Sequence, residues 1–133
     1  DSVAKPVWLV SYGVTAPAML LNVREHGMHV LFLGMLSNIA AISFNGGPMP
    51  ALPSALRGAG LHFDVSNNSA RMSHPHLAWL VDRWAAPAWV PWGNVFSVGD
   101  VLIAGGGLLF ALGATGALRP PSIVLRRRAA SSA

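Results

Sequence analysis

Two of the few acids in this chain stand where they could do chemistry. Asp100 follows Ser97 in a Ser-x-x-Asp spacing, directly before residues 101–118, which contain no charged side chain. Asp82 lies 18 residues earlier. Two carboxylates about 3 Å apart cannot both be ionised, so one holds a proton while the other activates water. If the fold brings Asp82 and Asp100 together, the pair predicts an aspartyl hydrolase.

Both acids also have a purely structural interpretation. A Ser-x-x-Asp sequence before an apolar run is typical of a helix start, because the serine hydroxyl accepts a hydrogen bond from a free backbone N–H and the carboxylate bonds back to the cap residue. The acid also favours the positive end of the helix dipole. We therefore predict that Ser97 and Asp100 form a helix cap, while Arg83 offers the neighbouring Asp82 a salt bridge.

His26 and His29 are the candidates for holding a cofactor. They are three residues apart, so on a helix they would share a face, where imidazoles could ligate a metal ion or a tetrapyrrole. Beside Arg24 and Glu25, contact with solvated lipid head groups is the alternative. The chain has no cysteine, which excludes disulfides, thiolate metal sites and cysteine nucleophiles. We expect bound lipid but no cofactor and no metal, with a tetrapyrrole on His26 or His29 as the alternative.

The composition predicts a membrane protein. Of the 133 residues, 53% are hydrophobic and only 11% are charged, whereas soluble domains carry about 25% charged residues. Three segments approach the roughly 20 apolar residues that a membrane-spanning helix needs, and they are residues 6–23, 29–45 and 97–118. The first could instead be the core of a signal peptide, and a further span could precede Asp1. We predict an all-α membrane protein whose single polytopic domain covers residues 1–133.

Positive charges and tryptophans predict the orientation of this domain. Lys and Arg favour the cytoplasmic side of a bacterial inner membrane. We therefore expect a multi-pass protein with a basic cytoplasmic tail at residues 119–133 and an outer loop at residues 46–93. Trp prefers the membrane–water boundary, so residues 76–86 are expected to form a short interfacial helix. The expected interface anchors are Trp79, Trp84, Trp89, Trp92, Arg126, Arg127 and Arg128.

Small and polar residues within the expected spans indicate helix packing. Gly107, Ala111 and Thr115 recur every four residues and predict a packing face, because small side chains let membrane helices approach closely. Ser37 and Asn38 could form hydrogen bonds across such an interface. The spans carry no charge that would support an ion path, and no basic water-exposed face indicates a nucleic-acid partner. The leading interpretation is a non-enzymatic accessory or structural subunit that packs against other membrane protein subunits. Aspartyl hydrolysis and a pigment- or haem-binding subunit are the alternatives.

Two sequence blocks resemble domain of unknown function family 5317. The first is Asn-Gly-Gly-Pro-Met-Pro at residues 45–50, followed by Leu-Arg-Gly-Ala-Gly at residues 56–60. The second, Asn-Val-Phe-Ser-Val-Gly-Asp-Val-Leu-Ile at residues 94–103, is similar to the other signature of that family and stands in the same order. The family comprises small bacterial membrane proteins without an assigned activity. The resemblance therefore implies location and topology only.

A second resemblance is to signal peptidase II, the membrane aspartyl protease that processes lipoproteins. Asp82 and Arg83, and the block from Phe96 to Asp100, fall in places comparable to the two acid-bearing blocks of that family. The resemblance implies catalytic roles for Asp82 and Asp100. The chain departs from the pattern in three ways: no Gly-Asn pair precedes Asp82, Ser97 replaces an asparagine, and Gly99 replaces an alanine.

Overall fold

The chain combines three long helices with a small cap that contains the strands. The computed structural model describes residues 4–62, 69–87, 89–90 and 94–118. In chain order its elements are α1 (Ala4–Leu21), α2 (Met28–Phe44), β1 (Met49–Ala51), α3 (Pro53–Gly58), β2 (Ser69–Arg71), β3 (Trp84–Ala85), β4 (Val95–Phe96) and α4 (Val98–Ala114). The helical character that the sequence predicts is confirmed, but the all-α prediction is wrong, because the segment between α2 and α4 contains strands.

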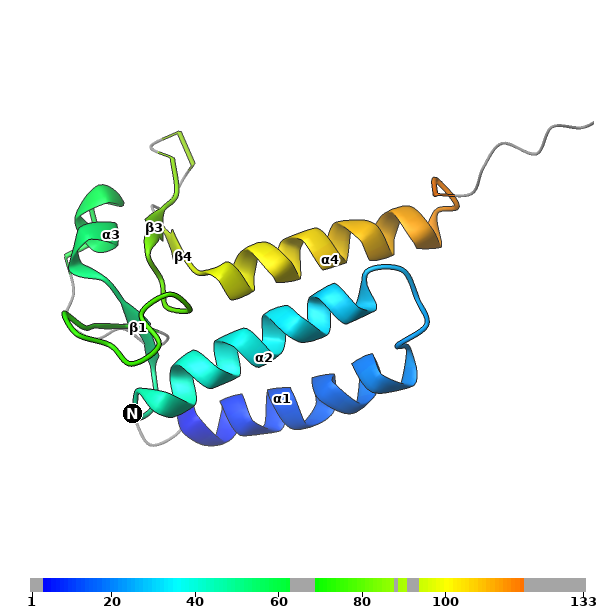
Figure 1. Cartoon of the computed structure of the whole chain (residues 1–133), viewed down its shortest axis with the longest axis horizontal. Helices are drawn as coiled ribbons and strands as arrows, with labels where there is room; N and C mark the ends of the chain where they lie inside the picture. The colour runs from blue at the N-terminus through cyan, green and yellow to red at the C-terminus, as the bar shows by residue number, and fades with distance from the viewer. Residues whose placement is uncertain (1–3, 63–68, 88, 91–93, 119–133) are drawn as a thin grey trace, which may run out of the picture.

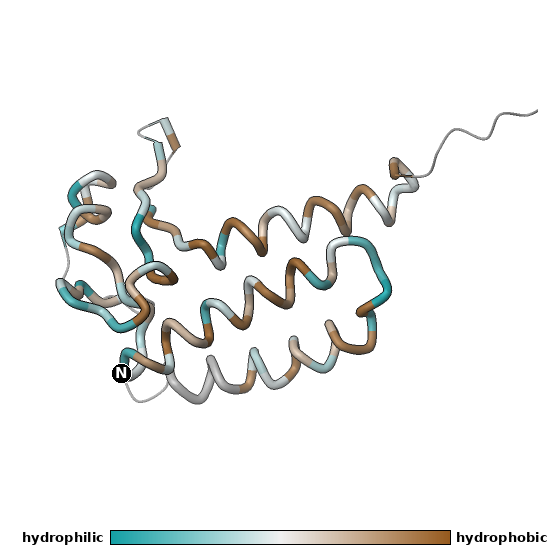
Figure 2. The backbone as a smooth tube through the Cα atoms, viewed as in Figure 1, coloured by the Kyte–Doolittle hydropathy of each residue, from teal (hydrophilic) through white to brown (hydrophobic). Residues whose placement is uncertain are grey.

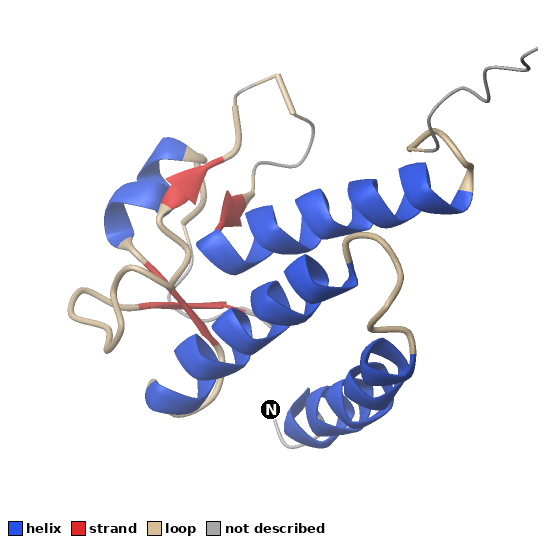
Figure 3. Cartoon of the chain, turned by 45° about the vertical axis from the view of Figure 1, so that its right-hand side comes forward, coloured by secondary structure: helices blue, strands red, loops and turns tan. Residues whose placement is uncertain are grey.

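The three long helices form one side-by-side layer, and the cap lies at one end of it (Figure 1). α2 lies between α1 and α4 and runs antiparallel to both of them. Its main partner is α4, and its contact with α1 is much smaller. Figure 3 shows α1 standing apart from the α2–α4 pair, whereas the cap meets the end of α2 and the start of α4.

Glycines bring α2 and α4 to backbone contact. Gly34 and Gly99 face each other, and Gly27, just before α2, faces Gly106. Gly27 and Gly34 are seven residues apart, and so are Gly99 and Gly106, which equals about two helical turns, so both contacts lie on one face. A Cβ added at Gly34 would lie 2.6 Å from the carbonyl oxygen of Gly99, and one added at Gly106 would lie 2.5 Å from a backbone nitrogen of α2. Larger residues would push the two helices apart.

The stripe predicted as a packing face lies elsewhere on α4. Ala111 and Thr115 are exposed, and a Cβ added at Gly107 would have no neighbour within 4 Å among the described residues. The physical reason is the helical turn of about 100° per residue, which rotates Gly107 away from the α2 contact made by Gly106. Within this chain the stripe does not pack α4 against α2. As a face for a partner outside the chain, it stays a prediction.

The cap is built on backbone pairing around β1. β1 pairs in parallel with β2, with Met49 opposite Ser69. On its other edge Ala51 bridges to Asp82: the N–H of Asp82 donates to the carbonyl of Pro50, and the N–H of Leu52 donates to the carbonyl of Asp82, both at 2.9 Å. β3 pairs antiparallel with β4. This network places Asp82 inside the cap, next to the start of α4.

The interfacial helix expected at residues 76–86 is absent from this described segment. Residues 76–80 form a turn in which Leu77 has a φ of 52°, and the chain then becomes extended. Leu80, Val81 and Asp82 are all buried, whereas three consecutive residues of a surface helix could not all face inward. Trp79, Trp84 and Trp89 are nevertheless 60%, 42% and 83% exposed. Trp92 lies outside the described residues.

The expected spans match the long helices in position, but not as membrane-crossing elements. α1 has 18 residues, and α2 and α4 have 17 each. Figure 2 shows apolar residues along all three helices and polar residues at the turn between α1 and α2. Within the described part of the chain, no helix is both long enough and apolar enough to cross a membrane. The prediction of three transmembrane helices is therefore not supported. Arg126, Arg127 and Arg128 lie outside the described residues.

Candidate functional site

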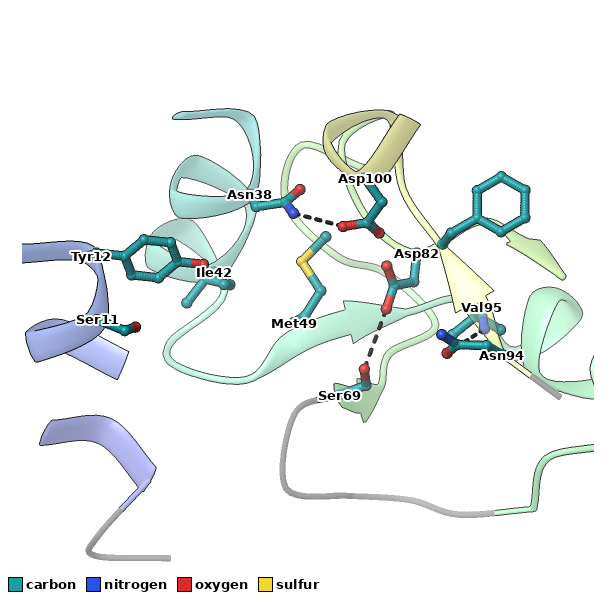
Figure 4. Close-up of a pocket in the computed structure, with 11 residues that line it drawn as sticks. Ser11, Tyr12, Asn38, Ile42, Met49, Ser69, Asp82, Asn94, Val95 and Asp100 are labelled. Carbon is teal, nitrogen blue, oxygen red and sulfur yellow. Dashed lines mark hydrogen bonds between the residues drawn. The ribbon is translucent and has the colours of Figure 1, made fainter. Parts of the chain in front are cut away.

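Asp82 and Asp100 line one pocket where the cap meets the helices. The pocket has a volume of about 490 Å³. Figure 4 shows the two carboxyl groups next to each other, with Asp82 on the cap and Asp100 in the first turn of α4. α1 and α2 supply the opposite wall. The described residues that line it are Ser11, Tyr12, Asn38, Ile42, Met49, Ser69, Asp82, Asn94, Val95, Phe96 and Asp100.

Asp100 is held by the N-terminal capping box of α4 and by a side chain of α2. Ser97 is the N-cap residue, and its Oγ accepts a hydrogen bond from the backbone N–H of Asp100 at 3.2 Å. The Asp100 Oδ2 accepts a bond from the Ser97 backbone N–H at 2.9 Å, which completes the capping box. From α2, Asn38 Nδ2 donates to Asp100 Oδ1 at 2.9 Å. These bonds fix the position and orientation of the Asp100 carboxyl group.

Asp82 has a very different environment. Only 5% of its surface is exposed, and Ser69 Oγ donates to its Oδ2 at 3.3 Å. Arg83, which the sequence offered as a salt-bridge partner, is exposed instead and lies over the ring of Trp84, with 5.3 Å from the guanidinium carbon to the ring centroid. Consecutive residues of an extended segment point to opposite sides, so Asp82 turns inward where Arg83 turns outward.

Burial, and to a smaller extent the negative charge of Asp100, raise the pKa of Asp82 from 3.8 to about 7. The hydrogen bond from Ser69 opposes this shift. Removing a carboxylate from water disfavours its charged form, and a like charge nearby adds to that effect. Near neutral pH Asp82 therefore retains a proton far more readily than an acid in water does.

Two acids that share a pocket can carry out acid–base chemistry when their environments differ. A protonated acid can donate to a leaving group, and an ionised carboxylate can accept a proton from water. Here Asp82 is buried and accepts a hydrogen bond from Ser69, whereas Asp100 accepts bonds from Ser97 and Asn38. Different environments are how paired carboxylates acquire different roles. Strongly perturbed acids in a pocket are candidates for a functional site.

The pocket lies within the part of the chain that matches a known protein family. The model of a family described as being of unknown function, DUF5317, matches residues 2–112. The chain belongs to the DUF5317 family. This confirms the family resemblance predicted from the two sequence blocks, and every residue that lines the pocket lies inside the matched DUF5317 segment. No curated protein and no solved structure matches the chain. The resemblance to signal peptidase II stays a prediction.

The histidines of this DUF5317 chain do not share a helix face. His26 lies in the turn before α2, whereas His29 lies in the first turn of that helix, and both are exposed. Gly27 between them has a φ of 77°, so the backbone reverses direction there. His26 instead packs on Gly113 of α4. Among the described residues, no group of three or more His, Asp or Glu side chains could hold a metal ion. Tetrapyrrole binding by His26 or His29 stays a prediction.

The sequence pointed to some of the polar residues in and around the DUF5317 pocket and missed others. Asn38 was expected to bond across a helix interface, and it does so with Asp100. Ser37, expected to do the same, has a buried Oγ without a hydrogen-bond partner in the described structure. Tyr12 and Ser69 were missed, because they reach the pocket from α1 and from β2. Neither stands in a motif that would mark it.

Proposed function

We propose that this chain is an aspartyl hydrolase in which Asp82 is the acid and Asp100 is the base. The observation that carries the proposal is the burial of Asp82 in the same pocket as Asp100. A buried carboxyl group with a single weak hydrogen bond destabilises a fold, and such groups are typical of functional sites. The capping role of Asp100 is compatible with this proposal, because a carboxylate oxygen can accept more than one hydrogen bond.

The reaction follows from the two protonation states. A water molecule in the pocket transfers a proton to Asp100 and bonds through its oxygen to the carbonyl carbon of an amide or ester. Asp82 transfers its proton to the leaving nitrogen or oxygen, and the bond from that atom to the carbonyl carbon breaks. The products are a carboxylic acid and an amine or alcohol. Proton exchange with solvent then returns Asp82 to its protonated form and Asp100 to its ionised form.

Cleavage of peptides and lipopeptides tests this proposal. We expect the purified full chain, in mild detergent, to hydrolyse members of a mixed peptide and lipopeptide pool, as followed by mass spectrometry. Because Asp82 must be protonated, the rate should fall as the pH rises through about 7. Asp82→Asn should lower the rate by about a hundredfold or more, since general acid catalysis contributes about that much.

The matched control is Glu25→Gln, which removes an exposed acid in the turn between α1 and α2 and should leave cleavage unchanged. If no member of the pool is cleaved, or if Asp82→Asn cleaves as fast as the natural chain, the hydrolase proposal is wrong.

The exposed apolar surface of the long helices favours a second candidate, an accessory subunit of a complex in the bacterial inner membrane. Large apolar side chains on all three helices are between 39% and 87% exposed. Many exposed large apolar side chains on one set of helices are typical of contacts with proteins or lipid. The side chains concerned are Val10, Val14, Leu20, Leu21, Leu33, Leu36, Phe44, Val101, Leu108, Leu109 and Phe110.

Two glycines of α4 provide a matched test of this second candidate. Gly107 belongs to the exposed stripe that predicts a partner, and Gly105 lies on a different side of the same helix; a Cβ added at either would have no neighbour within 4 Å among the described residues. We expect Gly107→Leu to release a partner that co-purifies stoichiometrically in mild detergent, because close helix contact requires small residues. Gly105→Leu should retain that partner. A lone monomer with no co-purifying subunit would argue against the accessory role.

A further inference from the structure

Asn38 connects the two helices at the point where they support the acid pair. It lies in α2, and its side chain reaches across to the first turn of α4. Its Nδ2 donates to Asp100 Oδ1 at 2.9 Å, and its Oδ1 lies 3.0 Å from the Oγ of Ser97, which can donate to it. Both the nitrogen and the oxygen of the amide therefore have a hydrogen-bond partner. The opposite amide orientation would set its oxygen against the carboxylate, which the charges disfavour.

The space for this contact comes from Gly99. A Cβ added there would overlap Asn38 Oδ1 and would lie 2.6 Å from Asn38 Cγ. Gly99 also contacts the backbone of Gly34, one helical turn before Asn38. The close approach of α2 and α4 thus places the amide beside the carboxylate, which is an arrangement that neither helix could make alone.

The hydrogen bonds to the two acids of the pocket are unequal. Asp100 accepts bonds from the Ser97 backbone N–H and from Asn38, and the Ser97 hydroxyl lies 2.9 Å from its Oδ2. It also sits at the positive end of α4, where a negative charge is favoured. Among the described residues, Ser69 alone donates a side-chain hydrogen bond to Asp82, at 3.3 Å. When two acids share a pocket, the proton resides on the acid that is less well stabilised as an anion.

We propose that Asn38 is a positioning residue that keeps the negative charge on Asp100 and thereby leaves the proton of the pair on Asp82. This inference rests on the proposed hydrolase function for its purpose, but the proton distribution itself is a property of the folded chain. Without the amide of Asn38, Asp100 loses a donor to its Oδ1 and the preference for a charge there weakens. The proton is then shared more evenly, and Asp82 loses part of its distinct role as the acid.

The test is an NMR titration of the side-chain carboxyl carbons of the full chain in mild detergent. In the natural chain, Asp82 should titrate with a pKa of about 7. In Asn38→Leu, we expect part of the titration of Asp82 to move to lower pH, because a proton that is no longer confined to Asp82 is shared by two interacting acids, which then titrate as a pair. A residue that only supports the fold would not produce this shift in a variant that remains folded.

Ser37→Ala is the matched control. It removes a buried polar atom that has no hydrogen-bond partner in the described structure and is the immediate neighbour of Asn38 on α2. It should leave the pKa of Asp82 unchanged. If Asn38→Leu loses its helical circular dichroism, Asn38→Ala, which is smaller, replaces it in the same measurement. An Asp82 pKa that is unchanged in a folded Asn38 variant overturns the inference.

The same samples separate this inference from the hydrolase proposal. If the natural chain cleaves nothing but the Asn38 variant shifts the pKa of Asp82, the proton distribution is as inferred and the hydrolase function is wrong. If the chain cleaves substrate and the pKa does not move, the hydrolase function stands and the role of Asn38 is wrong.

Discussion

Replacing Asp82 with asparagine is expected to stabilise the folded chain above pH 7. The pKa of Asp82 is 3.8 without the influence of the fold and about 7 in the folded chain. The folded state therefore binds a proton that the unfolded state has already released, and stability falls as the pH rises between these two values. The favourable contribution is complete below pH 3.8 and is lost once the pH passes about 7. Asparagine is neutral at every pH, so the variant does not lose stability in this way as the pH rises.

The expected gain for Asp82→Asn at alkaline pH is about 2 to 4 kcal/mol in the free energy of unfolding, since one pKa unit corresponds to about 1.4 kcal/mol. Denaturant unfolding of both proteins in the same detergent, at a series of pH values, measures it. Near pH 4 the two curves should coincide, because a protonated acid and an amide are both neutral and similar in size. Glu25→Gln removes an exposed acid and should follow the natural chain throughout. A variant that is less stable than the natural chain at alkaline pH would contradict the buried, charge-coupled environment of Asp82.

Gly106→Ala is expected to destabilise the chain by about 1 to 3 kcal/mol, because the added methyl group overpacks the contact between α2 and α4. The new Cβ would lie 2.5 Å from the backbone nitrogen of Leu31 and 2.9 Å from the carbonyl oxygen of Gly27. Backbone atoms cannot move aside as a flexible side chain can, so the helices would have to separate. This cost outweighs the gain of about 1 kcal/mol that alanine normally brings to a helix. Thermal and denaturant unfolding give the difference.

Gly107→Ala is the control, since it changes the next residue of the same helix by the same methyl group. A Cβ there has no neighbour within 4 Å among the described residues. It should stabilise the chain by about 0.5 to 1 kcal/mol through helix propensity alone. Equal effects of the two substitutions would mean that Gly106 is not at a close helix contact. The comparison therefore tests the geometry that also brings Asn38 to Asp100.

The capping box at the N-terminus of α4 is the part of the site that was most directly predictable. Ser97 and Asp100 are three residues apart, and the capping box depends on contacts within one helical turn. Asp82 was a candidate only on the condition that it meets Asp100, and nothing local to either residue decides that. The condition depends on the pairing of Asp82 with β1, which links segments about thirty residues apart in the chain.

In the segment that carries Asp82, the prediction of a helix from the sequence was wrong. Four tryptophans within residues 76–92 favoured an interfacial helix, because Trp prefers a boundary between apolar and polar surroundings. In the fold, the backbone of Asp82 bonds to Pro50 and Leu52, and those bonds require an extended chain. Tertiary pairing therefore outweighed the local pattern. The small-residue stripe does not pack against α2 for a related reason, since several glycine faces were available on α4 and only packing selects one of them.

By itself, the sequence determined the apolar helical segments, the cap at Ser97 and Asp100, and the family to which the chain belongs. These depend on residue types and on spacings of a few residues, which act wherever the segment lies. Only the tertiary structure decided that Gly34 and Gly99 bring α2 against α4, that Asn38 reaches Asp100 across 62 positions of the chain, and that Asp82 is buried beside them. Burial and charge coupling arise between groups that are close in space. The raised pKa of Asp82 could therefore not be predicted from the sequence alone.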